Sequence, residues 1–288
     1  MADATNSLEE FSKYVDAELV EPLRAVLIGR KIVPVTPEHG LGVSAVEFHK
    51  IVEMGEGVVT YSFSDAGEDE INITPTTLKL PIHIKDYRID RRHYESYREK
   101  GINIDNSTAL SAAFVAANKE DATIIRGYAG DGSTYDIKGL YEGAGNTYAG
   151  SDFGTAGNPT DAVAGAMDAL EQDDVPVSSC NLILHPTQRN ELRALRNSYG
   201  IREEPEVLEM LNGGAIYSSK ALTAGTGLLI PTVNLARPYF DYFLGVDWRT
   251  EHGTESEHPD TSDLHGRVYS TGVLRIKHDV AICTITGI

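Results

Sequence analysis

Apolar residues recur at three- and four-residue spacing between residues 6 and 28, which predicts an amphipathic helix near the start of the chain. Residues 29–35 are expected to follow as an extended arm, because Pro34 and Pro37 keep this segment from becoming helical. The chain is therefore expected to open with a helix followed by an arm.

Between residues 43 and 80 the pattern changes to that of strands. Residues 58–63 and 71–74 are rich in β-branched and aromatic side chains, and a polar turn separates them. An isolated hairpin of this kind is marginal in water, so we expect it to lie against another chain. Its apolar residues are expected to be half exposed in a single subunit and to contact that neighbour: Val58, Tyr61, Phe63, Ile71 and Ile73.

Residues 78–89 alternate, with Leu and Ile on one face and Lys79, His83 and Lys85 on the other. The charged segment 91–101 is predicted to be helical.

The clearest helix is predicted to start at Asp105 or Ser107 and to end at Gly127, with an alanine-rich face that allows close packing. Alternating helical and strand patterns between about residues 140 and 235 indicate a compact α/β subdomain. Residues 267–285 are rich in Val, Ile and Thr and are predicted to form a pair of strands.

Composition narrows the class of protein. The chain has 288 residues, and its 43 Asp and Glu against 25 Lys and Arg give a net charge of −18. This balance argues against a protein that holds DNA through a basic face, although it leaves contact with a packaged genome open. The chain shows no apolar run of the ~20 residues that a membrane helix needs, and no leader pattern, so we expect an intracellular protein. Cys180 and Cys283 lie in apolar runs and are interpreted as buried, unpaired residues.

Candidate chemistry is sparse. The glycine-rich stretch 127–132 follows a predicted helix, whereas a nucleotide-binding loop must follow a strand, so no cofactor is predicted. One segment, 251–265, gathers carboxylates and imidazoles that could bind a divalent cation. Its candidate ligands are His252, Glu255, Glu257, His258, Asp260, Asp263 and His265. The same segment contains Gly, Ser, Thr and Pro, which is typical of a solvated loop, so we predict neither a metal site nor a catalytic residue.

Five segments occur in an order that identifies a family. They are GRKIVPV at 29–35, LPIHIKDYRID at 80–90, AANKEDATIIRG at 116–127, LILHP at 182–186 and LNGG at 211–214. This order resembles that of the encapsulins, the linocin-like shell proteins, over nearly the whole chain. The resemblance implies an α+β chain with the Hong Kong 97 phage-type capsid fold.

The same resemblance implies a domain plan. A helix and arm would span 1–44, an extended β-hairpin loop 45–80, a peripheral domain with a long spine helix 81–135 and 241–288, and an axial domain 136–240. One loop of the axial domain would approach a pore on a symmetry axis, namely Asn197, Ser198, Tyr199, Gly200, Ile201, Arg202, Glu203 and Glu204.

Three functions follow, in order of preference. The first is a major capsid protein that assembles through hexamers and pentamers into an icosahedral shell around the double-stranded DNA of a tailed virus or provirus. Portal and accessory capsid proteins would then be further partners, the virion would assemble in the host cytoplasm, and the acidity would suit a halophilic archaeal host. The alternative is an encapsulin nanocompartment that holds a cargo enzyme by a short docked peptide. The third is a metal-dependent enzyme using residues 252–265; under the first two the chain is structural, with no enzymatic activity and no membrane partner.

Overall fold

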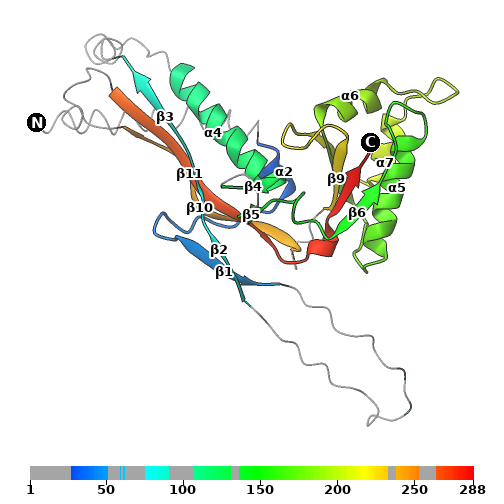
Figure 1. Ribbon diagram of the computed structural model, residues 1–288, viewed down its shortest axis with the longest axis horizontal. Coiled ribbons are helices and arrows are strands. Elements are labelled where there is room, and N and C mark those ends of the chain that lie inside the picture. The colour runs from blue at the N-terminus through cyan, green and yellow to red at the C-terminus, as the bar shows by residue number, and fades with distance from the viewer. Residues whose placement is uncertain are drawn as a thin grey trace, which may run out of the picture.

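The computed structural model describes residues 27–50, 59, 61, 75–90, 107–130, 136–232, 238–252 and 264–288. Figure 1 shows two lobes side by side, a long sheet flanked by a helix and a unit of strands and helices, with a two-stranded ladder projecting below. The helix predicted over residues 6–28 lies outside the described residues except for residues 27 and 28, which are not helical. The helix predicted over residues 91–101 and nearly all of the hairpin at 58–74 also lie outside them.

The first lobe is built on three long antiparallel strands in the order β10-β11-β3. β11 (Leu264–Ile276) lies between β10 (Phe240–His252) and β3 (Ile82–Ile89). The helix α4 (Ser107–Ile125) runs along β3 and β11 (Figure 1). It buries five alanines, whose small side chains allow close packing: Ala109, Ala112, Ala113, Ala116 and Ala117. These features confirm the predicted spine helix, which stops before Gly127, a residue with a φ of 115° that glycine adopts readily.

The second lobe contains a five-stranded sheet in the order β6-β12-β9-β7-β8. Its strands are β6 (Asn146–Ala149), β7 (Cys180–Leu184), β8 (Ile216–Ser218), β9 (Thr226–Pro231) and β12 (Cys283–Thr286). Its helices are α5 (Asn158–Glu171), α6 (Pro186–Ala194) and α7 (Glu204–Met210). The α/β pattern predicted between residues 140 and 235 is thereby confirmed, with β7 buried along its whole length.

This five-stranded sheet is covered on both faces. Leu182, Leu184 and Leu229 belong to a core that includes residues of α5 and α7. Ile183 and Leu228 belong instead to a second core, which includes residues of α4, β10 and β11. Because successive strand residues face opposite sides, β7 and β9 serve both cores and join the two lobes into one body. Cys180 and Cys283 are free and buried, and burial raises the pKa of each thiol to about 11.

The projecting ladder consists of β1 (Ala45–His49) and β2 (Pro75–Lys79), which pair antiparallel with Ala45 opposite Lys79. Val46 is buried in a small core with Ile137, Phe243 and Val273, which fixes the base of the ladder to the three-stranded sheet. Two further strands, β4 (Gly127–Tyr128) and β5 (Ile137–Lys138), pair with each other just after α4.

The segment after residue 28 differs from its prediction. An extended arm was expected over residues 29–35, but Gly29–Ile32 form one helical turn, α2, and only the chain beyond it is extended. The reason lies in α4, because a carboxylate there accepts the backbone N–H groups of Ile28 and Gly29, as a helix cap does. Pro34 lies beyond this turn, so it limits the helix without preventing it.

The pair of strands predicted over residues 267–285 is also wrong. Both strands exist, but β11 belongs to the three-stranded sheet and β12 to the five-stranded sheet. The N–H groups of Lys277 and His278 both donate to the carbonyl of Tyr239, and the short helix η3 (Asp279–Ala281) follows. This turn carries the chain from one lobe to the other.

On β3 the buried side is the reverse of what polarity suggests. His83 is 6% exposed, whereas its neighbours Ile82 and Ile84 are 57% and 46% exposed. β3 is an edge strand that packs against α4 on the side of His83. Position in the sheet therefore decides which side is buried.

No helix in the described part of the chain is long and apolar enough to cross a membrane.

Two adjacent glycines after α7 give a test of the second lobe. A Cβ atom added at Gly214 would overlap the carbonyl oxygen of Cys180, whereas Gly213 has open space and a φ of 88°. We expect Gly214→Ala to lower the free energy of unfolding by about 3 kcal/mol or more. Gly213→Ala should cost about 1–2 kcal/mol, the penalty of a left-handed alanine. Denaturant unfolding would contradict this packing if both variants lost equal stability.

Candidate functional site

A buried carboxylate fixes the N-terminal segment to the spine helix. Asp121 on α4 accepts the N–H of Ile28 at 2.9 Å and the N–H of Gly29 at 2.5 Å. These amides open the turn α2 and would otherwise lack partners. Burial raises the pKa of Asp121 to about 6, although the two N–H donors oppose that rise.

The neighbouring residue on α4, Glu120, is fully buried and pairs with Arg30. Arg30 Nε lies 2.7 Å from Glu120 Oε1 and Arg30 Nη2 lies 3.1 Å from Oε2, so the contact is bidentate. The same guanidinium donates to Asp247 at 2.5 Å and to the hydroxyl of Ser270 at 3.0 Å. One side chain from α2 therefore connects α4, β10 and β11.

The local chemistry keeps Arg30 charged. Burial alone would lower its pKa, but Glu120 and Asp247 more than compensate, and the pKa lies above the usual range. The rings of Tyr242 and Trp248 lie 5.7 and 5.9 Å from the guanidinium carbon. Asp247 is presented from an irregular stretch of β10, where the pairing with β11 shifts between Val246 and Arg249.

His83 lies beside this cluster as a buried neutral group. Within the described residues, neither of its ring nitrogens has a hydrogen-bond partner. Burial lowers its pKa, the charge of Glu120 opposes the shift, and the charges of Arg30 and Lys119 add to it. Nothing in this arrangement resembles a nucleophile with its base, so the cluster is a structural junction.

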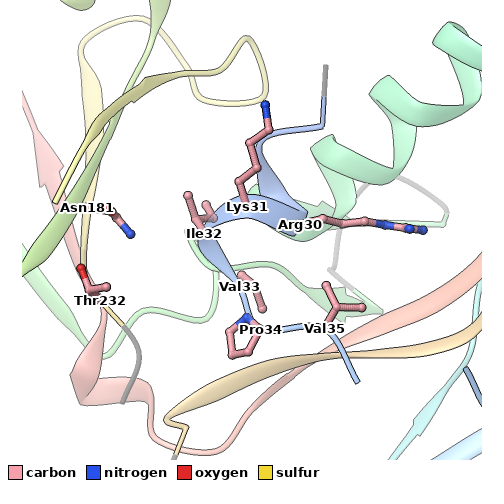
Figure 2. A pocket seen from close by; sticks show the side chains of 8 residues that line it. All are labelled: Arg30, Lys31, Ile32, Val33, Pro34, Val35, Asn181 and Thr232. Carbon is pink, nitrogen blue, oxygen red and sulfur yellow. The ribbon is translucent and has the colours of Figure 1, made fainter. Parts of the chain in front are cut away.

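A groove of about 410 Å³ lies where the two lobes meet (Figure 2). Residues 30–35 form one wall, while Asn181 of β7 and Thr232 after β9 line it from the second lobe. The side chain of Asn181 has a structural role, because its Oδ1 accepts the N–H of Ala215 at 3.0 Å.

The expected pore residues form a compact loop between α6 and α7. In Figure 1 this loop projects from the second lobe on the side away from the three-stranded sheet. Tyr199 and Ile201 are exposed at its tip. Glu203 instead points inward and accepts the N–H of Gly157 at 2.9 and 3.1 Å, and Glu204 pairs with Arg189 at 2.7 Å. The pore assignment of residues 197–204 stays a prediction.

Of the five hairpin residues expected at a subunit contact, only Tyr61 lies within the described residues. Tyr61 and the nearby Val59 are fully exposed. Val58, Phe63, Ile71 and Ile73 lie outside the described part, so their role stays a prediction. At the end of the ladder where the excursion begins, Lys50 pairs with Asp279 at 3.1 Å, a contact that sequence analysis missed.

Of the candidate metal ligands, two lie within the described residues, His252 and His265. His252 ends β10, and its Nε2 lies 2.8 Å from the hydroxyl of Tyr87. Burial lowers the pKa of His252 to about 4. His265 immediately precedes Gly266, the residue that pairs with His252, so the two histidine side chains start on opposite faces of the sheet. Glu255, Glu257, His258, Asp260 and Asp263 lie outside the described residues, and within the described ranges no three His, Cys, Asp or Glu gather as metal ligands do.

Sequence reasoning also missed the junction of Arg30, Glu120 and Asp121. A signal was present, because Glu120 and Asp121 lie three and four residues from Ala117 and from Ile124, on the buried stripe of α4. Charged residues at core positions of a helix indicate buried partners.

The junction predicts a pH-dependent effect on stability. A carboxyl whose pKa rises on folding from 3.8 to about 6 destabilises the folded state once it ionises, so stability falls as the pH rises through that window. Asp121→Asn cannot ionise and still offers an oxygen to Ile28 and Gly29. Relative to the unchanged protein, the variant should gain about 2 kcal/mol in unfolding free energy between pH 4 and pH 7. Calorimetry at both pH values measures the gain, with Glu206→Gln as an exposed control; equal changes in both variants would contradict it.

Comparisons with known proteins agree with this architecture. The family model described as "Encapsulating protein for peroxidase" (Linocin_M18) matches residues 5–260. The chain is 26% identical over 286 residues to the type 1 encapsulin shell protein EncA of Myxococcus xanthus, covering 97% of this chain and 93% of that protein. It is 27% identical over 264 residues to a diheme-cytochrome–encapsulin shell fusion protein of Kuenenia stuttgartiensis, covering 90% of this chain and 68% of that protein.

Solved structures show the same fold at low identity. A virus-like particle from Pyrococcus furiosus matches with a TM-score of 0.69 and 18% identity, over 96% of this chain and 99% of that chain. The capsid of Myoviridae phage XM1 matches with a TM-score of 0.63 and 12% identity, over 91% and 92%. The expected α+β capsid fold is thereby confirmed, and the chain belongs to the encapsulin family of shell-forming proteins.

Proposed function

We propose that this protein forms a closed shell that encloses a cargo protein inside the cell. The observation that carries the proposal is the match to the encapsulin shell protein of Myxococcus xanthus across 97% of this chain. The sequence alone favoured a viral capsid around DNA, but the relatives that carry a family name are encapsulins, and the phage capsids share the fold only at low identity.

Assembly would depend on contacts that one subunit cannot make for itself. The ladder β1–β2 is held at its base by Val46, and Val59 and Tyr61 farther along the excursion are fully exposed. Covering such side chains with a neighbouring copy would contribute about 25 cal/mol per Å² of apolar surface. Weak contacts of this kind become strong when repeated around a closed lattice. In that shell the divisions 1–44, 45–80, 81–135 with 241–288, and 136–240 would act as arm, extended loop, peripheral domain and axial domain.

A cargo protein suits the charge of the chain better than a genome. The net charge is −18, so an inner surface made from this chain would offer little attraction for phosphates. A packaging motor could force DNA into such a shell, which keeps the viral capsid as a second candidate.

Purified particles distinguish the two. We expect closed shells by electron microscopy, with a co-purifying protein identified by mass spectrometry and no nucleic acid that survives nuclease treatment. A long protected double-stranded DNA with no enclosed protein would contradict the cargo proposal and favour the capsid. Subunits that never assemble at any salt concentration would contradict both.

The extended loop gives a direct test of assembly. Deletion of residues 56–74 leaves the ladder β1–β2 and both lobes intact, so we expect a folded protein with normal circular dichroism that forms no closed particles. Val59→Ser with Tyr61→Ser is the milder version at positions where a single subunit loses no packing. Leu208→Ser, a partly exposed position on α7, is the control. Closed particles from the deletion variant would show that the loop is dispensable.

A further inference from the structure

The loop between α6 and α7 carries a local positive charge, in contrast to the negative net charge of the chain. Arg196 and Arg202 form an isolated antiparallel bridge at its base, so the two residues lie directly opposite each other. Opposed strand residues have Cβ atoms about 4.5–5.5 Å apart, and like charges in this position destabilise the pair. Both side chains are exposed, and among the described residues neither has an ion-pair partner.

The acidic residues that follow do not balance this pair. Glu203 is 2% exposed and its carboxylate is engaged by the N–H of Gly157. Glu204 is shared between Arg189 at 2.7 Å and Arg193 at 3.9 Å. No Asp or Glu occurs from residue 192 to 202, in a chain whose net charge is −18.

The loop holds these cations in a fixed frame. Asn197 Oδ1 accepts the N–H groups of Tyr199 and Ile201, each at 3.0 Å, and the N–H of Asn197 donates to the carbonyl of Ile201 at 2.8 Å. Arg196 Nη1 donates to the carbonyl of Gly200 at 2.9 Å, which places that guanidinium against the tip. Gly200 closes the turn with a φ of 77°.

Two exposed apolar side chains flank the cations. Tyr199 is 87% exposed and Ile201 is 63% exposed. Where the loops of several subunits meet, these side chains would exclude water and lower the local dielectric constant. A lower dielectric constant strengthens the attraction of a guanidinium for an anion. Paired guanidinium groups also match the geometry of oxyanions such as phosphate and carboxylate.

We propose that the α6–α7 loop is an anion-binding entrance of the shell, which favours small anions over cations through Arg196 and Arg202. The inference rests on the proposed shell and on this loop lying at an opening between copies. Several loops around one opening would multiply the cationic pair into a ring, and the field of such a ring raises the local concentration of anions. The opposed arginines, which are unfavourable in one subunit, would then be stabilised by the anions that they attract.

Ion entry into assembled shells tests the proposal. Shells are loaded with a fluorophore that both iodide and thallium(I) quench, and stopped-flow mixing measures the two entry rates. Each rate is normalised to the quenching of free fluorophore by the same ion. We expect the normalised rate of iodide entry to exceed that of thallium(I) about tenfold or more. Arg202→Gln, which keeps the contact from Arg196 to Gly200, should reduce this ratio, and Arg196→Gln with Arg202→Gln should bring it near one.

Two further variants separate charge from structure. Arg196→Lys with Arg202→Lys keeps the charge and should keep the ratio, but added phosphate should slow iodide entry less than in the unchanged shell. Lys220→Gln, an exposed cation elsewhere in the same lobe, is the control and should change nothing. Closed shells with equal entry of both ions, or with a ratio that the arginine variants leave unchanged, would overturn the proposal while leaving the shell function intact. A failure to form shells at all would overturn the proposed function and this inference with it.

Discussion

The ion pair between Arg30 and Glu120 is the contact on which the arrangement of the first lobe depends. It is withdrawn from solvent, bidentate, and extended by Asp247 and Ser270. Buried ion pairs contribute little net stability, but removing one partner costs about 3–5 kcal/mol because the other charge is left unpaired. We therefore regard the cluster as a device that fixes position, because only one placement of α2, α4, β10 and β11 satisfies every group.

Two parts of the molecule project from the body that this junction holds together, the ladder β1–β2 and the α6–α7 loop, and each is attached at a different place. The ladder β1–β2 is attached through a small apolar core on the three-stranded sheet, and the α6–α7 loop is attached to the second lobe through Glu203 and Glu204. Neither projection shares a described contact with the other. In the proposed shell, projections that are independent of each other would let each one meet a different neighbouring copy.

Fold and family answer different questions here. The fold, shared with a phage capsid and with the particle from Pyrococcus furiosus, shows how the chain is built, and membership of a shell-forming family indicates that its copies enclose a volume. The family, defined by the sequence match to encapsulins, bears on what occupies that volume. The proposed cargo protein is accordingly supported by the relatives and by the net charge of the chain.

The sequence by itself determined the local elements. The alanine spacing and Gly127 predicted α4, the apolar run predicted β7, and the order of short motifs predicted the family and the capsid fold. Tertiary structure alone decided that residues 29–32 form a helical turn, that β11 and β12 enter different sheets, and that His83 is buried while Ile82 is exposed. The physical reason is distance along the chain: a periodic pattern reports the next few residues, whereas Arg30 meets partners 90 and 217 positions away.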